Sequence, residues 1–254
     1  MTRRRIRFSG TFAARWAVYL VAALVICTEA ANARCRQALA LGLDVSGSVD
    51  ATEYRLQMQG LANALRHPEV RAALLGASAA PVEIAVYEWS APDYQRILVA
   101  WTAITDDATL QSVAAQIAAT PRQPAPPVTG LGQAMLFGQN LLRQRADCWK
   151  RTLDISGDGR NNSGPDPRDV KAVLSDMTLN ALVIGADAPH GGDLRQVEIA
   201  ELSSYFRALV IFGPDAFVET AIGFEDYEEA MVRKLIRELE TLIVSDAAKT
   251  RLSR

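Results

Sequence analysis

The sequence predicts an α/β domain built on a doubly wound, mainly parallel six-stranded sheet with helices on both faces. Apolar runs alternate with amphipathic stretches along nearly the whole chain, which is typical of a parallel sheet covered by helices. Several runs, such as Ala181–Ile184, are continuously apolar, as expected of strands buried on both faces. The chain has 254 residues, which suits one such domain behind a short leader.

Six short apolar runs, each bounded by polar or turn-forming residues, are expected to form the strands. They span Ala38–Asp44, Val82–Trp89, Arg96–Trp101, Arg151–Ile155, Asn180–Gly185 and Ala208–Phe212. Only the second and third runs have no helical stretch between them. The short link Ser90–Asp93 predicts a hairpin there, so one strand at an edge of the sheet should run antiparallel.

Six stretches with apolar residues at helical spacing are expected to form the helices. They span Ala51–Leu65, Ala108–Ala118, Gly130–Arg143, Pro167–Met177, Asp193–Tyr205 and Tyr227–Ile243. The apolar stripe of the last one, with Met231, Leu235 and Leu239, is more typical of a face in the core than of a partner groove. The Pro-rich segment Pro121–Pro127 is expected to be a stiff loop that delivers Thr129.

The first residues have the pattern of a secretory signal peptide. Four arginines within the first seven residues precede the apolar stretch Trp16–Cys27, and Ala31–Ala33 forms an A-x-A cleavage site. We expect a leader over residues 1–33 that is cleaved after Ala33, a domain over 34–245 and a flexible tail over 246–254. The apolar stretch is well short of the ~20 residues of a membrane span, although an uncleaved anchor is an alternative. Thr2–Arg4 also resembles a twin-arginine export signal, and Leu24–Cys27 comes near a lipoprotein box.

The charge and the histidine content exclude several function classes. Loss of residues 1–33 removes five arginines and one glutamate, which moves the formal charge from −2 to −6 and gives no indication of nucleic-acid binding. The sequence has no G-x-S-x-G elbow, no P-loop and no G-x-G-x-x-G fingerprint. With only His67 and His190 in the chain, a Ser-His-Asp triad is improbable.

Oxygen-bearing side chains follow the first and fourth expected strands. Asp44, Ser46 and Ser48 lie two residues apart, so an extended turn can aim all three the same way, and Asp158 lies just past the fourth strand. The carboxyl ends of adjacent parallel strands meet at one rim, where Thr129 would supply an oxygen ligand from a third loop. Such hard oxygen donors suit Mg²⁺, Ca²⁺ or Mn²⁺.

Simpler explanations exist for each part of this pattern. Ser46 and Ser48 fit an ordinary Ser-Gly turn, and Thr129 fits a plain helix N-cap before Gly130. Asp154–Gly159 imitates the start of an EF-hand loop, but its twelfth position is Pro165 instead of a glutamate, so Asp154 is expected within the strand. Three further residues either shape the rim or form a turn that caps the next helix: Asn161, Asn162 and Asp166.

Taken together, Asp44, Ser46, Ser48, Thr129 and Asp158 resemble the metal-ion-dependent adhesion site (MIDAS) of von Willebrand factor type A (VWA) domains. The resemblance covers about Ala38–Ile243 and is greatest to an uncharacterised group of exported bacterial proteins. It implies the sheet order 3-2-1-4-5-6 and a divalent cation, with Mg²⁺ first and Ca²⁺ or Mn²⁺ as alternatives. It also implies that an Asp or Glu carboxylate of a partner protein completes the coordination.

The expected function is therefore a cation-dependent protein-binding module in the periplasm, or secreted, with no catalytic activity, no nucleic-acid partner and no stable membrane span after cleavage. Metal-dependent phosphoester hydrolysis and a purely structural ion are the alternatives. The implied sheet order also places Cys35 and Cys148 just before neighbouring strands, at the end opposite the metal. We expect a disulfide there, with two unpaired buried thiols as the alternative.

Overall fold

A computed structural model describes residues 35–76, 80–185 and 193–252 of the chain. The expected leader and its cleavage after Ala33 lie outside the described residues. The strands are β1 (Gln37–Asp44), β2 (Val82–Trp89), β3 (Gln95–Ile104), β4 (Lys150–Gly157), β5 (Thr178–Ile184) and β6 (Val218–Ala221). The helices are α2 (Ala51–Arg66), α3 (Pro68–Leu75), α4 (Asp107–Ala118), α5 (Leu131–Arg143), α6 (Pro167–Lys171), α7 (Asp193–Leu209), the 3-10 helix η1 (Phe224–Asp226) and α8 (Tyr227–Leu252).

The strands form one sheet in the order β3-β2-β1-β4-β5-β6, which confirms the expected topology. All neighbouring pairs are parallel except β2 and β3, which form the expected antiparallel hairpin at one edge. Every residue of the central strand β1 is buried, as its apolar sequence predicts for a strand covered on both sides.

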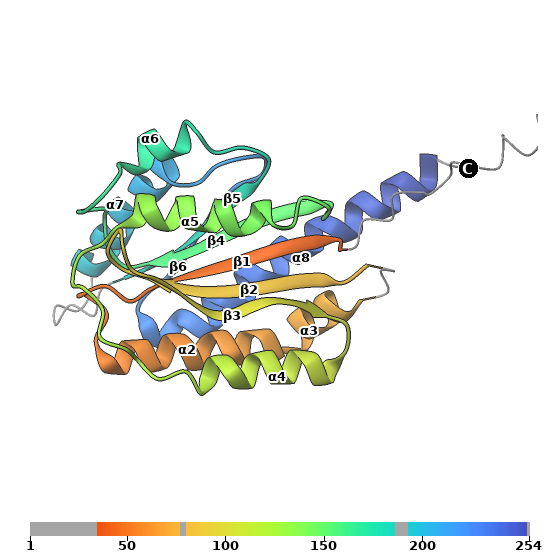
Figure 1. Cartoon of the computed structure of the whole chain (residues 1–254), viewed down its shortest axis with the longest axis horizontal. Helices are drawn as coiled ribbons and strands as arrows, with labels where there is room; N and C mark the ends of the chain where they lie inside the picture. The colour runs from red at the N-terminus through yellow and green to blue at the C-terminus, as the bar shows by residue number, and fades with distance from the viewer. Residues whose placement is uncertain (1–34, 77–79, 186–192, 253–254) are drawn as a thin grey trace, which may run out of the picture. The chain divides into compact units, whose positions relative to one another are not determined.

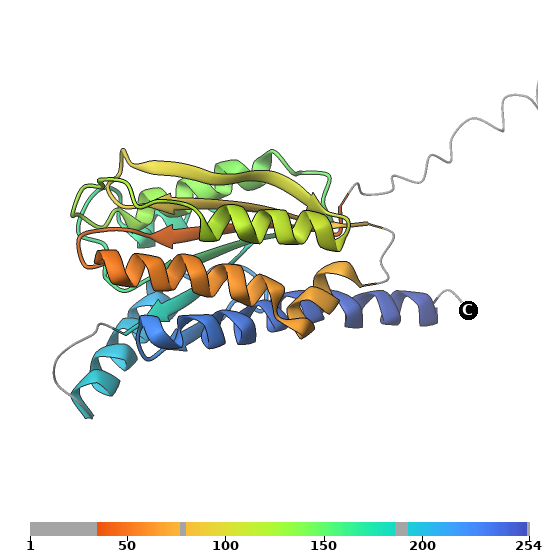
Figure 2. The same ribbon diagram turned by 90° about the horizontal axis from the view of Figure 1, so that it is seen from below.

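Helices cover both faces of the sheet (Figure 1). The helices α5, α6 and α7 pack on one face, whereas α2, α3, α4 and α8 pack on the other, as the view from below also shows (Figure 2). Alternate residues of β1 enter the two cores: Leu39, Leu41 and Leu43 face α2 and α8, and Ala38 and Ala40 face α5. This three-layer arrangement leaves the carboxyl ends of the parallel strands at one rim.

The position predicted for the sixth strand is wrong. The apolar run Ala208–Phe212 instead completes α7 and then makes an isolated antiparallel bridge between Phe212 and Leu179. The true strand is the partly exposed Val218–Ala221, which pairs with β5. A short apolar run looks the same in the sequence whether it ends a buried helix or forms a strand, which explains the false prediction. An edge strand is partly exposed and contains fewer apolar residues than a central strand, which explains why the true strand was missed.

Three helices also differ from the expected ranges. α3 was not expected, and begins at Pro68, a residue favoured at the first helical position. α6 ends at Lys171 instead of Met177, and Asp176, just before β5, adopts a left-handed conformation (φ 55°) that a helix could not contain. α8 continues past Ile243 to Leu252. Within the described ranges, none of the helices combines the length and apolar character that crossing a membrane requires.

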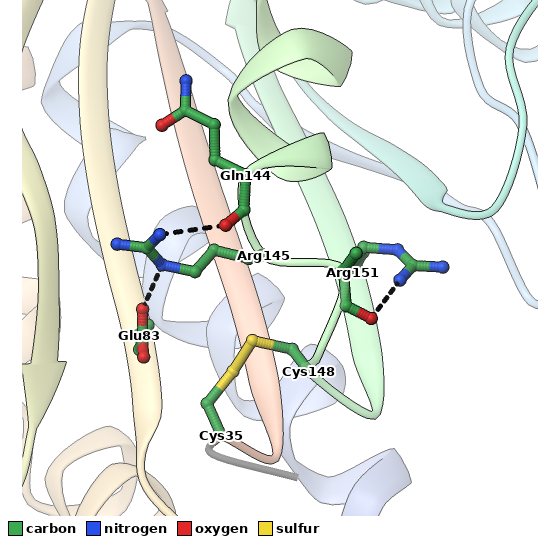
Figure 3. The surroundings of a disulfide bond; sticks show 7 residues. Cys35, Glu83, Gln144, Arg145, Cys148 and Arg151 are labelled. Carbon is green, nitrogen blue, oxygen red and sulfur yellow. Dashed lines mark hydrogen bonds and ion pairs between the residues drawn. A yellow bond between two sulfur atoms is a disulfide. The ribbon is translucent and has the colours of Figure 1, made fainter.

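Cys35 and Cys148 form the expected disulfide at the amino ends of β1 and β4 (Figure 3). Their Cα atoms lie 4.8 Å apart, and the bridge closes a segment of 113 residues. The backbone continues the pairing of the two strands at this point, because Trp149 N–H donates to the Cys35 carbonyl (3.2 Å). An ion pair between Arg145 and Glu83 lies beside the bridge. The bridge therefore ties two neighbouring strands at the end opposite the rim.

Candidate metal centre

The five residues predicted from the sequence meet at the carboxyl ends of β1 and β4. Asp44 is the last residue of β1, and Ser46 and Ser48 lie in the turn between β1 and α2. Asp158 directly follows β4, which pairs with β1 up to the register Leu43 to Ser156. Two neighbouring parallel strands thus bring both carboxylates to the same rim.

Hydrogen bonds join the five side chains into one cluster. Ser48 Oγ donates to Asp158 Oδ1 (2.7 Å), and the hydroxyl oxygens of Ser46 and Ser48 lie 3.3 Å apart. Thr129 Oγ1 donates to Ser46 Oγ (3.3 Å), while Ser46 N–H donates to Asp44 Oδ1 (2.8 Å). Three loops that are far apart in the sequence therefore converge on one group of oxygen atoms.

The hydroxyl of Thr129 lies in this cluster and does not cap the following helix. The N-cap of α5 is Gly130, which has no side chain with which to cap the helix. Instead, the Thr129 backbone is held by Asn162, whose Oδ1 accepts from Thr129 N–H (2.8 Å) and whose N–H donates to the Thr129 carbonyl (3.0 Å). These bonds fix the loop and leave the hydroxyl free to turn toward Ser46.

The residues after Asp158 divide between the two roles left open by the sequence. Asn161 Oδ1 accepts from Gly132 N–H (3.2 Å) at the start of α5, so Asn161 and Asn162 together hold the loop that carries Thr129. Asp166 instead caps α6, with its carboxylate accepting from Arg168 N–H (2.8 Å). Asp154 lies within β4, as expected, and pairs with Lys234.

The two rim carboxylates lie near one another, with Asp44 fully buried and Asp158 partly buried. Burial raises the pKa of Asp44 well above its ordinary value, and the neighbouring Asp158 carboxylate raises it further. Burial also raises the pKa of Asp158, against the opposing effect of the Ser48 hydrogen bond. Without a compensating positive charge, this rim disfavours the ionised form of both acids.

The donor set fits a hard divalent cation. Asp44 Oδ2 is buried and makes no hydrogen bond, although a carboxylate oxygen inside a protein is normally paired. The cluster adds three neutral hydroxyls to two carboxylates, the oxygen chemistry that Mg²⁺ and Ca²⁺ prefer. Among the described residues, no group of three or more His, Cys, Asp or Glu side chains is placed to hold a metal ion. A thiolate or imidazole site of the zinc type therefore has no counterpart in this part of the chain.

Two supporting residues could not be assigned to the site from the sequence. Gln57 of α2 donates to the Asp44 carbonyl (3.0 Å), and the buried Glu88 of β2 accepts hydrogen bonds from side chains of α2 and of the β2–β3 hairpin. Glu88 has a recognisable signal, because an acid inside the apolar run Val86–Trp89 indicates a buried, paired charge. Two of its partners, Tyr94 and Arg96, lie six and eight residues away in the same hairpin, whereas Tyr54 comes from α2 and is placed beside Glu88 only by the fold.

Comparisons with known proteins agree with this architecture. A family model described as "Protein of unknown function (DUF1194)" matches residues 34–243. No curated protein matches the sequence. Proximal thread matrix protein 1 from the mussel byssus, solved with a zinc-occupied MIDAS motif, gives a TM-score of 0.57 at 13% identity, over 82% of this chain and 47% of that one.

Two further solved structures show the same fold. The pilus adhesin SpaC from Lactobacillus rhamnosus GG gives a TM-score of 0.54 at 14% identity, over 82% of this chain and 31% of the adhesin. A von Willebrand factor type A protein from Catenulispora acidiphila gives 0.54 at 14% identity, over 81% of this chain and 43% of that one. This chain spans less than half the length of each of these three proteins. At these identities the comparisons establish a VWA-type fold.

Proposed function

We propose that this chain, which belongs to the DUF1194 family, binds a divalent cation at the rim and uses it to bind a carboxylate of a partner protein. Asp44, Ser46, Ser48, Thr129 and Asp158 would hold the ion. When bound, the ion would supply an open coordination position that an Asp or Glu side chain can occupy. The observation that carries the proposal is the buried Asp44 Oδ2, which has no hydrogen-bond partner and lies near the partly buried carboxylate of Asp158.

The charge of the site favours an acidic ligand. Two carboxylates only neutralise the double charge of the ion, so a third carboxylate from outside is still attracted. Mg²⁺ is the first candidate, with Ca²⁺ and Mn²⁺ as alternatives, because the same oxygen donors serve all three. A hydrolase would need a general acid or base beside the metal, and the two acids at this rim would already serve as ligands.

The proposal includes export of the chain. A leader over residues 1–33, cleaved after Ala33, would deliver a domain over 34–245 and a tail over 246–254 to the periplasm or the exterior. The disulfide between Cys35 and Cys148 supports an oxidising compartment, because such bridges persist there and are rare in the cytosol. The adhesin and matrix proteins that share the fold support a role in protein binding.

Calorimetric titration of Mg²⁺, Ca²⁺ and Mn²⁺ into the metal-stripped protein tests the cation site. We expect saturable binding in the wild type and none in Asp44→Ala or Asp158→Ala. A capped Gly-Asp-Gly peptide, with Gly-Asn-Gly as its control, then tests ligand capture on the loaded protein. Binding of only the acidic peptide, and only with metal, is expected. Metal binding without any effect of the acidic peptide would indicate a structural ion, and no metal binding would refute the proposal.

A further inference from the structure

A buried acid behind the rim links the segments that carry the hydroxyl ligands. Glu88 of β2 is 0% exposed, and its carboxylate accepts three side-chain hydrogen bonds. Tyr94 Oη and Arg96 Nε donate to Oε1, both at 2.8 Å, and Tyr54 Oη donates to Oε2 at 3.1 Å. Burial of a carboxylate away from water is unfavourable unless its oxygens are hydrogen-bonded. The three hydrogen bonds to Glu88 compensate for its burial and fix the position of the side chain.

The partners of Glu88 belong to two elements, α2 and the β2–β3 hairpin. Tyr54 lies in the first turns of α2, immediately after the turn that holds Ser46 and Ser48. Arg96 also donates through Nη2 to the carbonyl of Pro121 (3.3 Å), where the Pro-rich loop begins. The guanidinium of Arg122 in the same loop lies 5.8 Å from the centre of the Tyr54 ring. One carboxylate thus connects α2, the β2–β3 hairpin and the loop.

The far end of the Pro-rich loop carries Thr129 and contacts the serine turn directly. Gly47 N–H, between the two serines, donates to the Pro127 carbonyl (3.0 Å). Gly130 N–H donates to the Ser90 carbonyl (2.6 Å) at the tip of the hairpin. The relative position of Thr129 and the two serines therefore depends on how the loop sits between α2 and the hairpin, and these are the elements that Glu88 holds.

We infer that Glu88 is a positioning residue for the cation site and, through Tyr54 and Arg96, sets the spacing of the three hydroxyl ligands. The inference rests on the proposed function, because it assigns Glu88 a role toward the ion held there. Glu88 itself contacts none of the five rim residues in the hydrogen bonds described above. Its effect on the ion is transmitted by the loops and concerns affinity, while the two carboxylates remain in place.

Metal affinity of matched variants tests the role. Mg²⁺ is titrated by calorimetry into wild type, Glu88→Gln and Glu238→Gln, at a temperature where thermal unfolding curves show all three fully folded. Glu238 is the control because it is an equally buried acid on the same side of the sheet, paired with Lys234 and bonded through its carbonyl to Lys150 at the amino end of β4. We expect the dissociation constant to rise about 10-fold or more in Glu88→Gln, as for outer-shell residues of metal sites, and to be unchanged in Glu238→Gln.

A double-mutant cycle of Glu88→Gln with Thr129→Ala distinguishes a specific effect of Glu88 on the position of Thr129 from a general destabilisation of the fold. If Glu88 acts by placing Thr129, its substitution should weaken Mg²⁺ binding much less once the Thr129 hydroxyl is gone. Arg96→Lys keeps the positive charge beside Glu88 but loses the forked geometry that reaches Pro121, so it should also weaken binding and serves if Glu88→Gln does not fold. Three outcomes would overturn the role of Glu88. The first is wild-type affinity in both Glu88→Gln and Arg96→Lys, and the second is an equal loss of affinity in Glu88→Gln and Glu238→Gln. The third is additive effects of Glu88→Gln and Thr129→Ala in the double-mutant cycle. A wild type that binds no Mg²⁺, Ca²⁺ or Mn²⁺ would instead overturn the proposed function and this role with it.

Discussion

At the scale of single residues, the rim combines a buried acid with hydroxyls that hold one another in place. Burial, and then the charge of Asp158, raise the pKa of Asp44. A carboxyl group whose pKa is higher in the folded than in the unfolded state binds more protons when folded. Its contribution to stability is therefore present at low pH and is lost as the pH rises through the interval between the two values. A bound cation would reverse this trend, because it favours the charged form.

Replacement of Asp44 by asparagine should separate stability from binding. Asp44→Asn keeps an oxygen for the Ser46 N–H and removes the buried charge, so it should raise the free energy of unfolding of the metal-free protein at neutral pH. The expected gain is on the order of 1 kcal/mol, because the buried charge is removed while a buried polar amide group remains. Denaturant titrations in EDTA and in Mg²⁺ measure both effects. The wild type should gain stability from Mg²⁺ and the variant should not; a variant that is less stable than wild type in EDTA would contradict the electrostatic account.

Gly47 tests how tightly the serine turn must approach the Pro-rich loop. A Cβ at this position would lie 2.8 Å from Pro127 Cβ and 2.9 Å from the Pro127 carbonyl oxygen, so Gly47→Ala must displace the turn or the loop. We expect the dissociation constant for Mg²⁺ to rise about 10-fold or more. Gly159→Ala is the matched control, since its Cβ would meet only Thr129 Oγ1 at 3.8 Å, an ordinary contact. Equal affinities of the two variants in calorimetry would show that this approach does not matter.

At the scale of elements, predictions from the sequence succeeded where a local pattern carries the information. Short, mostly apolar or alternating runs predicted β1, β2, β4 and β5 to within two residues at each end. The D-x-S-x-S spacing after β1 predicted that Asp44, Ser46 and Ser48 belong to the site. The sixth strand was misplaced because Ala208–Phe212 is more apolar than the edge strand Val218–Ala221, and burial in a helix end explains that pattern equally well. The contacts of Asn162 with Thr129 and of Glu88 with Tyr54 could not be foreseen, because these pairs are more than 30 residues apart and only the fold brings them together.

The pairing of β1 and β4 makes the disulfide a stability element independent of the rim. Cys35→Ser combined with Cys148→Ser should lower the free energy of unfolding by about 2–5 kcal/mol, as for native bridges that close long segments. Because the bridge lies at the amino ends of the two strands and Asp44 and Asp158 at their carboxyl ends, Mg²⁺ affinity below the unfolding transition should not change. Denaturant unfolding of the double variant measures the loss of stability, and calorimetry on the same variant measures its Mg²⁺ affinity. A large loss of metal affinity would show that the bridge also orders the rim.

At the scale of the whole molecule, a buried ionic cluster joins the last helix to the centre of the sheet. Lys234 of α8 lies 2.6 Å from Asp154 Oδ2 of β4 and 2.6 Å from Glu238 Oε1. Asn180 of β5 donates to Glu238 Oε1 (2.7 Å) and accepts from Phe217 N–H (3.1 Å) through its own Oδ1. Two acids thus share one ammonium group in the core, so the cluster would carry an excess of negative charge if both acids were ionised. Docking of α8 therefore depends on the protonation state of these buried groups.

The excess charge predicts a pH dependence of global stability. Burial raises the pKa of Asp154 from 3.8 to about 7; the neighbouring Glu238 carboxylate acts in the same direction, and Lys234 opposes both. Since the folded value lies above the unfolded one, the stability contributed by protonated Asp154 is complete below the unfolded value and is lost as the pH rises through this interval. Asp154→Asn cannot titrate, so its free energy of unfolding should fall less than that of wild type between pH 4 and pH 7 in EDTA.

Glu238→Gln provides the companion measurement for the same cluster. It removes the second acid, so that Asp154 is the remaining acid of the cluster that pairs with Lys234. The pKa of Asp154 should therefore drop, and the loss of stability should move to lower pH. Denaturant unfolding of wild type and both variants across this range, followed by circular dichroism, distinguishes the cluster from the rim acids, which all three proteins retain. Identical pH profiles in the three proteins would show that the Asp154 carboxyl keeps one protonation state throughout, and that the dependence arises at Asp44 and Asp158 instead.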